Sequence, residues 1–205
     1  MARSSGEWGR FVKEAAKIMK WVDPTIEIMA ASTVDPDWNI NLLKEVGDWL
    51  DWISIHAYWD ILNDIYKPAP YETCMYHSTQ IEEKIFKAGY ILGSHGLLGK
   101  IRVAFDERNL RSWHHPNFRT AGREDILAKD EHDNNQDYTM ADAVFAACFL
   151  NQCLRHCDLV GMAYFSPVVN TRGAIYADPD GIVLLPSCFV FELYTKYMGD
   201  SVVDT

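Results

Sequence analysis

The alternation of helical and strand-like segments constrains the fold of this chain more than any other feature. Apolar residues at helical spacing stop at Asp23-Pro24, and the apolar run from Ile26 to Ala31 follows as a short buried strand. The same order repeats along the chain, and further strands are expected at Trp52 to Ala57, Ile101 to Phe105 and Leu159 to Phe165. Strands that alternate with helices pair in parallel through right-handed crossovers, so the sequence predicts an α/β fold.

The helices in this pattern are predicted from their apolar faces. These faces are Phe11, Ala15, Ile18 and Val22 in the first helix, Leu42, Leu43, Val46, Trp49 and Leu50 in the second, and Met75, Ile81, Ile85 and Phe86 in a third that begins at Pro70. Two more helices are expected from Tyr138 to His156 and from Ser187 to Met198, the latter after a turn at residues 178–181.

Two architectures have this alternation, an open doubly wound sheet and a (β/α) barrel. A glycine-rich phosphate loop after the first strand would favour the open sheet, but Ser32 to Pro36 stand there and the chain has no GxGxxG motif. A complete barrel takes about 250 residues and eight strands, whereas this chain has 205 residues, only four predicted strands and a long loop that uses part of the length. The sequence therefore predicts an incomplete (β/α)8 TIM barrel, about half of one.

The charge of the chain limits its partners. The formal net charge is -10 and the pI is near 5.1, whereas binding to a nucleic-acid backbone needs a basic surface. The sequence thus predicts no nucleic-acid partner and favours a neutral ligand. The 7 Trp, 10 Tyr and 9 Phe residues offer flat faces that suit sugar rings, although the default place of any one of them is the core.

Cysteine usage and the lack of long apolar segments favour a soluble cytoplasmic protein. The 5 cysteines are an odd number without a CxxC pair, as is typical of free thiols in a reducing compartment. No segment has the ~18 consecutive apolar residues of a membrane span, and Met1 to Glu7 lacks the apolar region of a signal peptide. Cys153 and Cys157 lie four residues apart at the end of an expected helix but lack further ligands at metal-site spacing, so we expect neither a metal nor a cofactor.

Polar side chains follow three of the predicted strands. The run Ile101 to Phe105 leads into Asp106, Glu107 and Asn109, and the other strand ends add Ser54, His56, Tyr58, Ser166 and Asn170. Successive side chains of a strand face opposite sides, so only one of the two carboxylates is the candidate for chemistry and the other supports it. A barrel builds its active site at the carboxyl ends of its strands, which predicts a site here. The alternative is that the carboxylates merely open a solvated loop.

A polar segment without periodicity extends from Arg111 to Gln136. Loops of this length inside compact domains are often functional. Trp113 is a candidate stacking platform for a sugar ring at the rim of the site, and the alternative is an ordinary surface loop.

The order and the amino-acid sequences of these segments resemble those of one family, the retaining α-L-arabinofuranosidases of glycoside hydrolase family 51. The matching segments are Lys17 to Ile26 before the fifth barrel strand, Trp52 to Tyr58 in the sixth, Ala104 to Glu107 in the seventh, and Val169 to Gly173 and Asp180 to Leu184 after the eighth. The resemblance implies that residues 1–200 hold barrel strands 5 to 8 with their helices. Residues 201–205 then begin a following β domain.

The resemblance also assigns roles to matching residues. Glu107 corresponds to the catalytic nucleophile, Tyr58 to a tyrosine beside it, and His56 to a histidine of the substrate pocket. Asp106 and Asn109 match the surrounding motif and are expected to orient the site.

A retaining glycosidase also needs a second carboxyl group about 5–5.5 Å from the nucleophile. The family's acid/base glutamate follows an Asn, but this chain has no Asn-Glu dipeptide, so we expect that residue to lie upstream of Met1. Arg108 stands where the family usually has Trp, and Pro167 where many members have Gln. Arg108 can favour the ionised form of Glu107 or block it in a salt bridge.

The implied activity is the hydrolysis of terminal α-L-arabinofuranosides in arabinose-containing oligosaccharides. The alternative is a non-catalytic half-barrel remnant that binds sugar. In both cases a half barrel leaves strand edges and apolar surface uncovered, so we expect a homo-oligomer or pairing with the missing half barrel.

Overall fold

The structure of the chain is a computed structural model that describes residues 4–61, 69–112, 124, 139–170 and 173–203. The chain divides into two compact units. The first unit comprises Met1–His56, Glu82–Asp106 and His156–Ala163, and the second comprises Ala57–Ile81, Glu107–Arg155 and Tyr164–Thr205.

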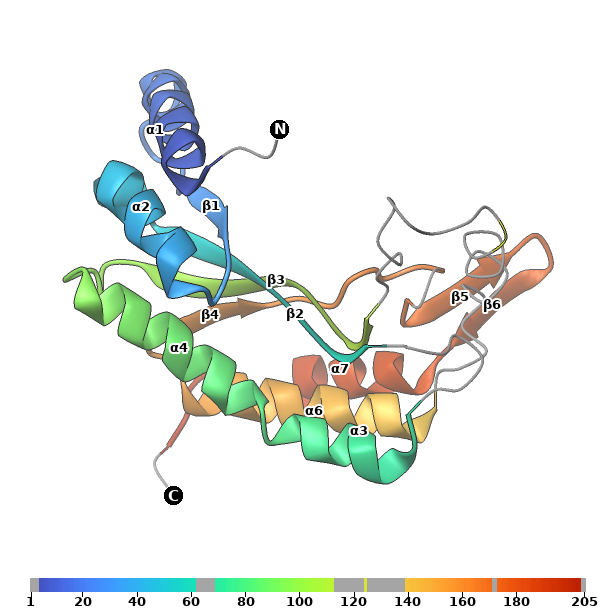
Figure 1. The fold of residues 1–205 in the computed structure, drawn as a ribbon. Coiled ribbons are helices and arrows are strands. Elements are labelled where there is room, and N and C mark those ends of the chain that lie inside the picture. Colours follow the sequence, from blue (N-terminus) through green and yellow to red (C-terminus); the bar gives the residue numbers. More distant parts are fainter. Residues whose placement is uncertain (1–3, 62–68, 113–123, 125–138, 171–172, 204–205) are drawn as a thin grey trace. The chain divides into compact units, whose positions relative to one another are not determined.

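The first unit is built on a 4-stranded sheet with the order β1-β2-β3-β4 (Figure 1). Its strands are β1 (Met29–Ser32), β2 (Trp52–Ile61), β3 (Arg102–Ser112) and β4 (Val160–Ala163), and both β2 and β3 continue into the second unit. β1 pairs with β2 in parallel, and β3 pairs with β4 in parallel. This arrangement confirms the predicted α/β fold with a parallel sheet.

Consecutive residues of β3 are buried, which explains its uninterrupted apolar run. Val103, Ala104 and Phe105 are all fully buried. Parallel strands that are covered on both faces lack the alternation of polar and apolar residues seen in half-exposed strands.

Helix α1 (Ser5–Val22) packs against α2 (Pro36–Val46), which is followed by the short 3-10 helix η1 (Gly47–Trp49). The contact depends on Gly9 of α1, because a Cβ atom there would lie 2.9 Å from Cβ of Glu45. The missing side chain therefore allows the two helices to approach closely.

The buried face of α1 differs from the predicted one. Ser5, Gly9, Val12 and Ala16 are buried, whereas the predicted face residues Phe11, Ile18 and Val22 are exposed. Close approach at the small residues decides which side of α1 meets α2, and apolar spacing alone does not reveal it.

The helix predicted from Pro70 is two helices, α3 (Tyr71–Ser78) and α4 (Ile81–Ser94). The hydroxyl groups of Ser78 and Thr79 donate hydrogen bonds to helix carbonyl groups three residues back, both at 2.7 Å. Side-chain hydroxyl groups that bond to nearby carbonyl oxygens compete with the helical pattern. The prediction of one continuous helix was wrong for this reason.

The second unit is organised around α6 (Met140–Arg155), which packs against both α3 and α7 (Pro186–Tyr197). Phe145 and Phe149 of α6 meet Trp59, with ring centroids 5.0 and 5.8 Å away. In the described part of the chain, no helix has the length and apolarity needed to cross a membrane.

A two-stranded antiparallel hairpin of β5 (Ile175–Asp178) and β6 (Gly181–Leu184) precedes α7 (Figure 1). The carboxylate of Asp178 accepts hydrogen bonds from the N–H groups of Asp180 and Gly181 at 2.9 and 3.0 Å. The sequence predicts this turn but not the strands, because β6 is exposed along its whole length and shows no alternation.

Candidate active site

The strand that carries the predicted carboxylates is longer than expected. β3 continues through Asp106 and Glu107 to Ser112 instead of ending at Phe105. Arg108 and Asn109 are buried, so the polar stretch is not a solvated loop. By the alternation of a strand, Glu107 and Asn109 share one side and Arg108 faces the other.

Glu107 is half-buried, and Tyr58 of β2 holds its carboxylate. The Tyr58 hydroxyl donates a hydrogen bond to Oε1 of Glu107 at 2.5 Å. Burial raises the pKa of Tyr58, the hydrogen bond to Glu107 and the charge of that carboxylate raise it further, and a hydrogen bond to Ser166 acts in the opposite direction. Tyr58 therefore stays protonated at neutral pH and is a constant donor to Glu107.

The segment after β4 is hydrogen-bonded to the second half of β3. Nδ2 of Asn109 donates to the carbonyl oxygen of Ser166 at 3.4 Å, and the N–H group of Ser166 donates to the carbonyl oxygen of Arg108 at 3.3 Å. Because Ser166 also contacts Tyr58, these residues form one connected group with Glu107 in the second unit.

Asp106 has its own partners, which belong to the first unit. Oγ of Ser54 donates a hydrogen bond to Oδ1 of Asp106 at 2.7 Å. Nε2 of His56 lies 3.8 Å from the same oxygen, and the His56 side chain is 48% exposed. A carboxylate beside an accessible imidazole orients that ring, which can then exchange hydrogen bonds with ligand hydroxyl groups.

The last two candidates are Asn170 and Trp113. Asn170 has a φ of 51°, and its side-chain amide exchanges two hydrogen bonds with the backbone of Ala177, at 3.0 and 2.7 Å. Both the nitrogen and the oxygen of this amide are thus bonded to β5. A substrate contact by Asn170 stays a prediction. Trp113 lies outside the described residues, as does nearly all of the polar segment that follows it.

Arg108 occupies a buried site among aromatic rings. Its guanidinium carbon lies 4.2 Å from the ring centroid of Phe149, and 5.3 Å from those of Phe165 and Phe191. A planar guanidinium stacks on aromatic faces, and the attraction is stronger where water is excluded. The sequence suggests a role for Arg108 only toward Glu107, because the rings come from distant segments that no local pattern connects to it.

The cysteines have no visible role in this site. Burial raises the pKa of the Cys153 thiol to about 12, while the positive charge of Arg108 acts in the opposite direction. A thiol that stays protonated is a poor nucleophile and a poor metal ligand. All five cysteines are free, and among the described residues no group of three or more His, Cys, Asp or Glu side chains is placed to hold a metal ion.

Comparison with known proteins places the chain among its relatives. A family model described as the α-L-arabinofuranosidase C-terminal domain matches residues 107–205. The intracellular exo-α-(1→5)-L-arabinofuranosidase of Halalkalibacterium halodurans is 28% identical over 98% of this chain, and the enzyme numbered 1 of the same name from Bacillus subtilis is 27% identical over 87%. The crystal structure of the Thermotoga maritima α-L-arabinofuranosidase in complex with arabinose matches 98% of the chain with a TM-score of 0.80 at 26% identity. The resemblance to the family 51 α-L-arabinofuranosidases is confirmed.

The chain spans less than half the length of the proteins it matches. It covers 40% of the H. halodurans protein, 36% of the B. subtilis protein and 38% of the T. maritima chain. A second solved structure, the family 51 enzyme of Thermotoga petrophila RKU-1, gives a TM-score of 0.77 at 27% identity and is covered to 38% as well. Glu107 is the first residue of the region that the family model matches.

Proposed function

We propose that this chain contributes the nucleophile side of a retaining α-L-arabinofuranosidase site, with Glu107 as the nucleophile. The observation that carries the proposal is the hydrogen bond from Tyr58, which fixes one oxygen of the Glu107 carboxylate beside a hydroxyl that stays protonated. The relatives are named for exo-α-(1→5)-L-arabinofuranosidase activity. We therefore take terminal α-L-arabinofuranosides of arabinose-containing oligosaccharides as the substrate class.

The proposed reaction has two steps. In the first, the Glu107 carboxylate attacks the anomeric carbon, the glycosidic C–O bond breaks, and a second carboxyl group gives its proton to the departing oxygen. In the second, that group takes a proton from water, which attacks the same carbon and releases arabinose from the enzyme ester. Tyr58 orients Glu107, and on the family resemblance we propose substrate contacts for His56, Asp106, Asn109 and Asn170. For Trp113 we propose stacking on a sugar ring at the rim of the site.

The acid/base carboxyl group is proposed to come from residues outside this sequence. The family places that glutamate after an Asn, and the 205 residues contain no such dipeptide. Asp106 is the carboxylate next to Glu107, but it accepts a hydrogen bond from Ser54 and lies near His56. These contacts suit a residue that orients the site.

The test uses an aryl α-L-arabinofuranoside whose phenol leaves readily without an acid. We expect intact-mass spectrometry to show one added pentosyl group on the wild-type chain and none on Glu107→Gln. Glu82→Gln is the matched control, because Glu82 pairs with His156 in the first unit, and it is expected to label like the wild type. Labelling that persists in Glu107→Gln, or is absent from the folded wild-type chain, contradicts the assignment.

A natural substrate distinguishes the missing acid from a complete site. General acid catalysis contributes about 10²- to 10⁴-fold, and poor leaving groups need it most. We therefore expect almost no turnover of α-(1→5)-arabinotriose by this chain alone, measured as released arabinose. Rapid turnover would place an acid within these residues.

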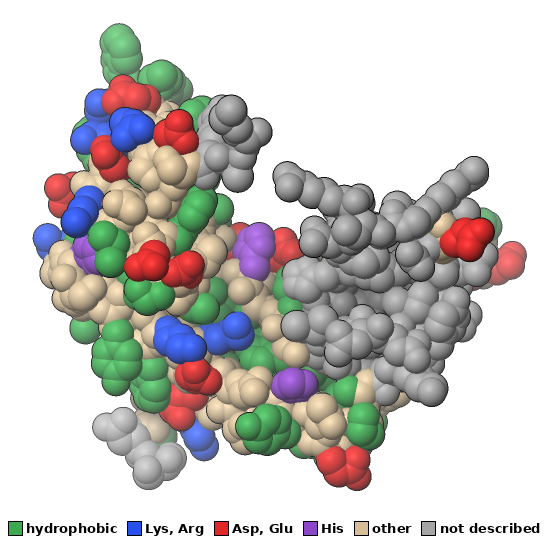
Figure 2. All heavy atoms as spheres, in the orientation of Figure 1, with side chains coloured by type: hydrophobic (Ala, Val, Ile, Leu, Met, Phe, Trp, Pro, Cys, Tyr) green, Lys and Arg blue, Asp and Glu red, His purple; other side chains and the backbone are tan. Residues whose placement is uncertain are grey.

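Association with another chain is the second proposal, and exposed apolar side chains near the end of α1 favour it. Ile18, Met19, Trp21 and Val22 are all exposed, Trp21 by 87%, and Figure 2 shows apolar side chains protruding there. We propose that residues 1–200 are the C-terminal half of a barrel that pairs with a second copy or with the missing half. Sedimentation should show a species larger than the monomer that Trp21→Ser weakens, and a monomer at every concentration argues against pairing.

We also propose a cytoplasmic location. The five free cysteines fit a reducing compartment, and the matched relatives are named intracellular enzymes. Fractionation of cells that express the tagged chain tests this, and recovery from the medium contradicts it.

A further inference from the structure

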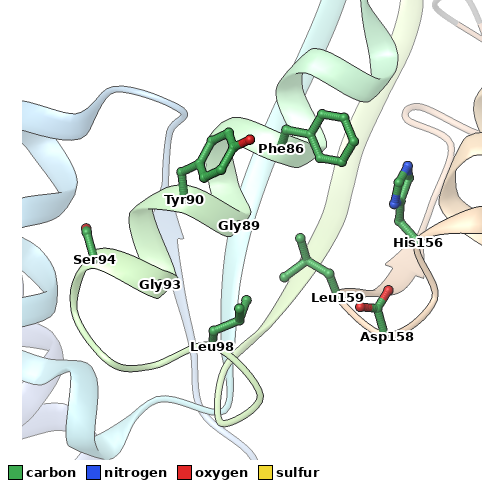
Figure 3. Close-up of a pocket in the computed structure, with 9 residues that line it drawn as sticks. All are labelled: Phe86, Gly89, Tyr90, Gly93, Ser94, Leu98, His156, Asp158 and Leu159. Atoms are coloured by element: carbon green, nitrogen blue, oxygen red, sulfur yellow. The ribbon is translucent and has the colours of Figure 1, made fainter.

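A cavity of about 560 Å³ lies in the first unit, between α4 and the segment that follows α6. Figure 3 shows Phe86 and Tyr90 on α4, with His156, Asp158 and Leu159 across the cavity. All the residues that line it belong to the first unit, and none of them belongs to the group around Glu107. Its size falls within the range of about 300–1,000 Å³ that is usual for ligand pockets.

Glycines keep the α4 side of this cavity open. A Cβ atom at Gly89 would lie 3.0 Å from Cδ2 of Leu159, so a larger residue there would push the Leu159 side chain aside. A Cβ atom at Gly93, in the last turn of α4, would meet nothing within 4 Å. Position 93 therefore has open space beside it, which a side chain much larger than that of alanine would fill.

The cavity offers two accessible aromatic rings. Tyr90 is 75% exposed and Phe86 is 45% exposed, and their ring centroids lie 6.5 Å apart. The His156 ring packs edge-on against Phe86 at 5.0 Å, and its Nε2 lies 2.8 Å from the Glu82 carboxylate. These contacts hold the His156 ring beside Phe86, and each of the two exposed rings offers a face on which an apolar surface can stack.

The charges around the cavity select among ligands. Asp158 adds an exposed carboxylate, and no Lys or Arg is among the residues that line the cavity. A phosphate or carboxylate ligand would meet repulsion here without a compensating cation. A neutral ring with hydroxyl groups fits, since its C–H face stacks on Tyr90 or Phe86 and its hydroxyl groups donate to Asp158.

We propose that this cavity is a binding site for a short neutral oligosaccharide, separate from the residues around Glu107. Binding here requires no chemistry at Glu107, so the inference stands or falls independently of the proposed reaction. A chain with such a site holds its carbohydrate at a second place on the surface.

The test follows the His156 imidazole signal in a two-dimensional ¹H–¹³C spectrum, assigned with His156→Gln, while α-(1→5)-arabinotriose or xylotriose is added at millimolar concentration. We expect a saturable shift with at least one of the two sugars. Gly93→Leu fills the cavity and Tyr90→Ala removes a platform, so each is expected to weaken binding about tenfold or more. Gly93→Ala is the matched control and should bind within about twofold of the wild type, because its Cβ atom enters open space.

Other outcomes overturn the proposal. A shift that persists unchanged in a folded Gly93→Leu, with folding checked by circular dichroism, places the sugar elsewhere. No shift with either sugar shows that the cavity does not take neutral sugars. A shift with tetramethylammonium alone shows in addition that its rings serve a cation. Glu107→Gln should leave the titration unchanged, which separates this site from the proposed nucleophile.

Discussion

Replacing Tyr58 by Phe removes one hydroxyl group and keeps the ring, so it isolates the contact on which the nucleophile assignment depends. The lost interaction is the hydrogen bond from the Tyr58 hydroxyl to the Glu107 carboxylate at 2.5 Å. Hydrogen bonds to charged groups contribute about 1.5–3 kcal/mol, and partial exposure of both side chains lets water compete. We therefore expect the free energy of unfolding to fall by about 1–2 kcal/mol in Tyr58→Phe.

A double-mutant cycle separates this contact from other effects of each substitution. Urea unfolding is measured for the wild type, Tyr58→Phe, Glu107→Ala and the double variant. We expect a coupling free energy of about 1 kcal/mol between the two positions, because either substitution alone already removes the hydrogen bond. The control cycle combines Tyr58→Phe with Glu82→Gln and should be additive within about 0.5 kcal/mol.

The labelling experiment extends the cycle to function. If Tyr58 orients the nucleophile, Tyr58→Phe should slow formation of the pentosyl adduct by about tenfold, which corresponds to about 1.4 kcal/mol in the barrier. Additive free energies in the Tyr58–Glu107 cycle together with an unchanged labelling rate would refute this reasoning, because they would show that the hydroxyl neither stabilises nor orients Glu107.

Two further predictions concern parts of the second unit outside this contact. The pKa of Cys153 is raised from 9.0 to about 12 in the folded state. Between these two values the folded chain keeps a proton that the unfolded chain loses. The free energy of unfolding of the wild type should therefore fall above pH 9, by up to about 1.4 kcal/mol per pH unit. Urea unfolding across that range should show a flatter dependence for Cys153→Ala, and the same slope in both proteins would contradict it. Asn170→Ala loses two hydrogen bonds and forces a φ of 51° on alanine, so we expect its free energy of unfolding to fall by about 1–3 kcal/mol. Asn170→Gly loses the same hydrogen bonds but should be destabilised less, because glycine tolerates this φ. Thermal unfolding compares the two variants, and equal losses would show that the backbone conformation is unimportant there.

The sequence predicts the sheet well because its signal is local. The buried runs at Trp52 and at Ile101 are continuous and bounded by turn residues, and the structure has strands at both places. The end of β3 could not be read in the same way. Asp106 to Asn109 look like a loop in sequence, and they remain in a strand because their partners lie on β2 and after β4.

The sequence names candidate residues for the site but does not predict most of their contacts. The sequence draws attention to Glu107, Tyr58 and His56 through the family resemblance, and the structure gives Glu107 and Tyr58 a direct hydrogen bond. The aromatic surroundings of Arg108 were missed, because Phe149 and Phe191 look like ordinary core residues of their helices. Such contacts depend on how distant segments pack, which spacing along one segment does not encode.

The setting of Arg108 has a consequence for how this chain responds to acid. A guanidinium stays charged at every pH at which proteins fold, so its contacts with Phe149, Phe165 and Phe191 do not titrate. These rings therefore anchor the backbone between Glu107 and Asn109 with equal strength on both sides of neutrality. A pH profile measured on this chain then reports proton transfers at side chains, since the strand that presents them keeps its place.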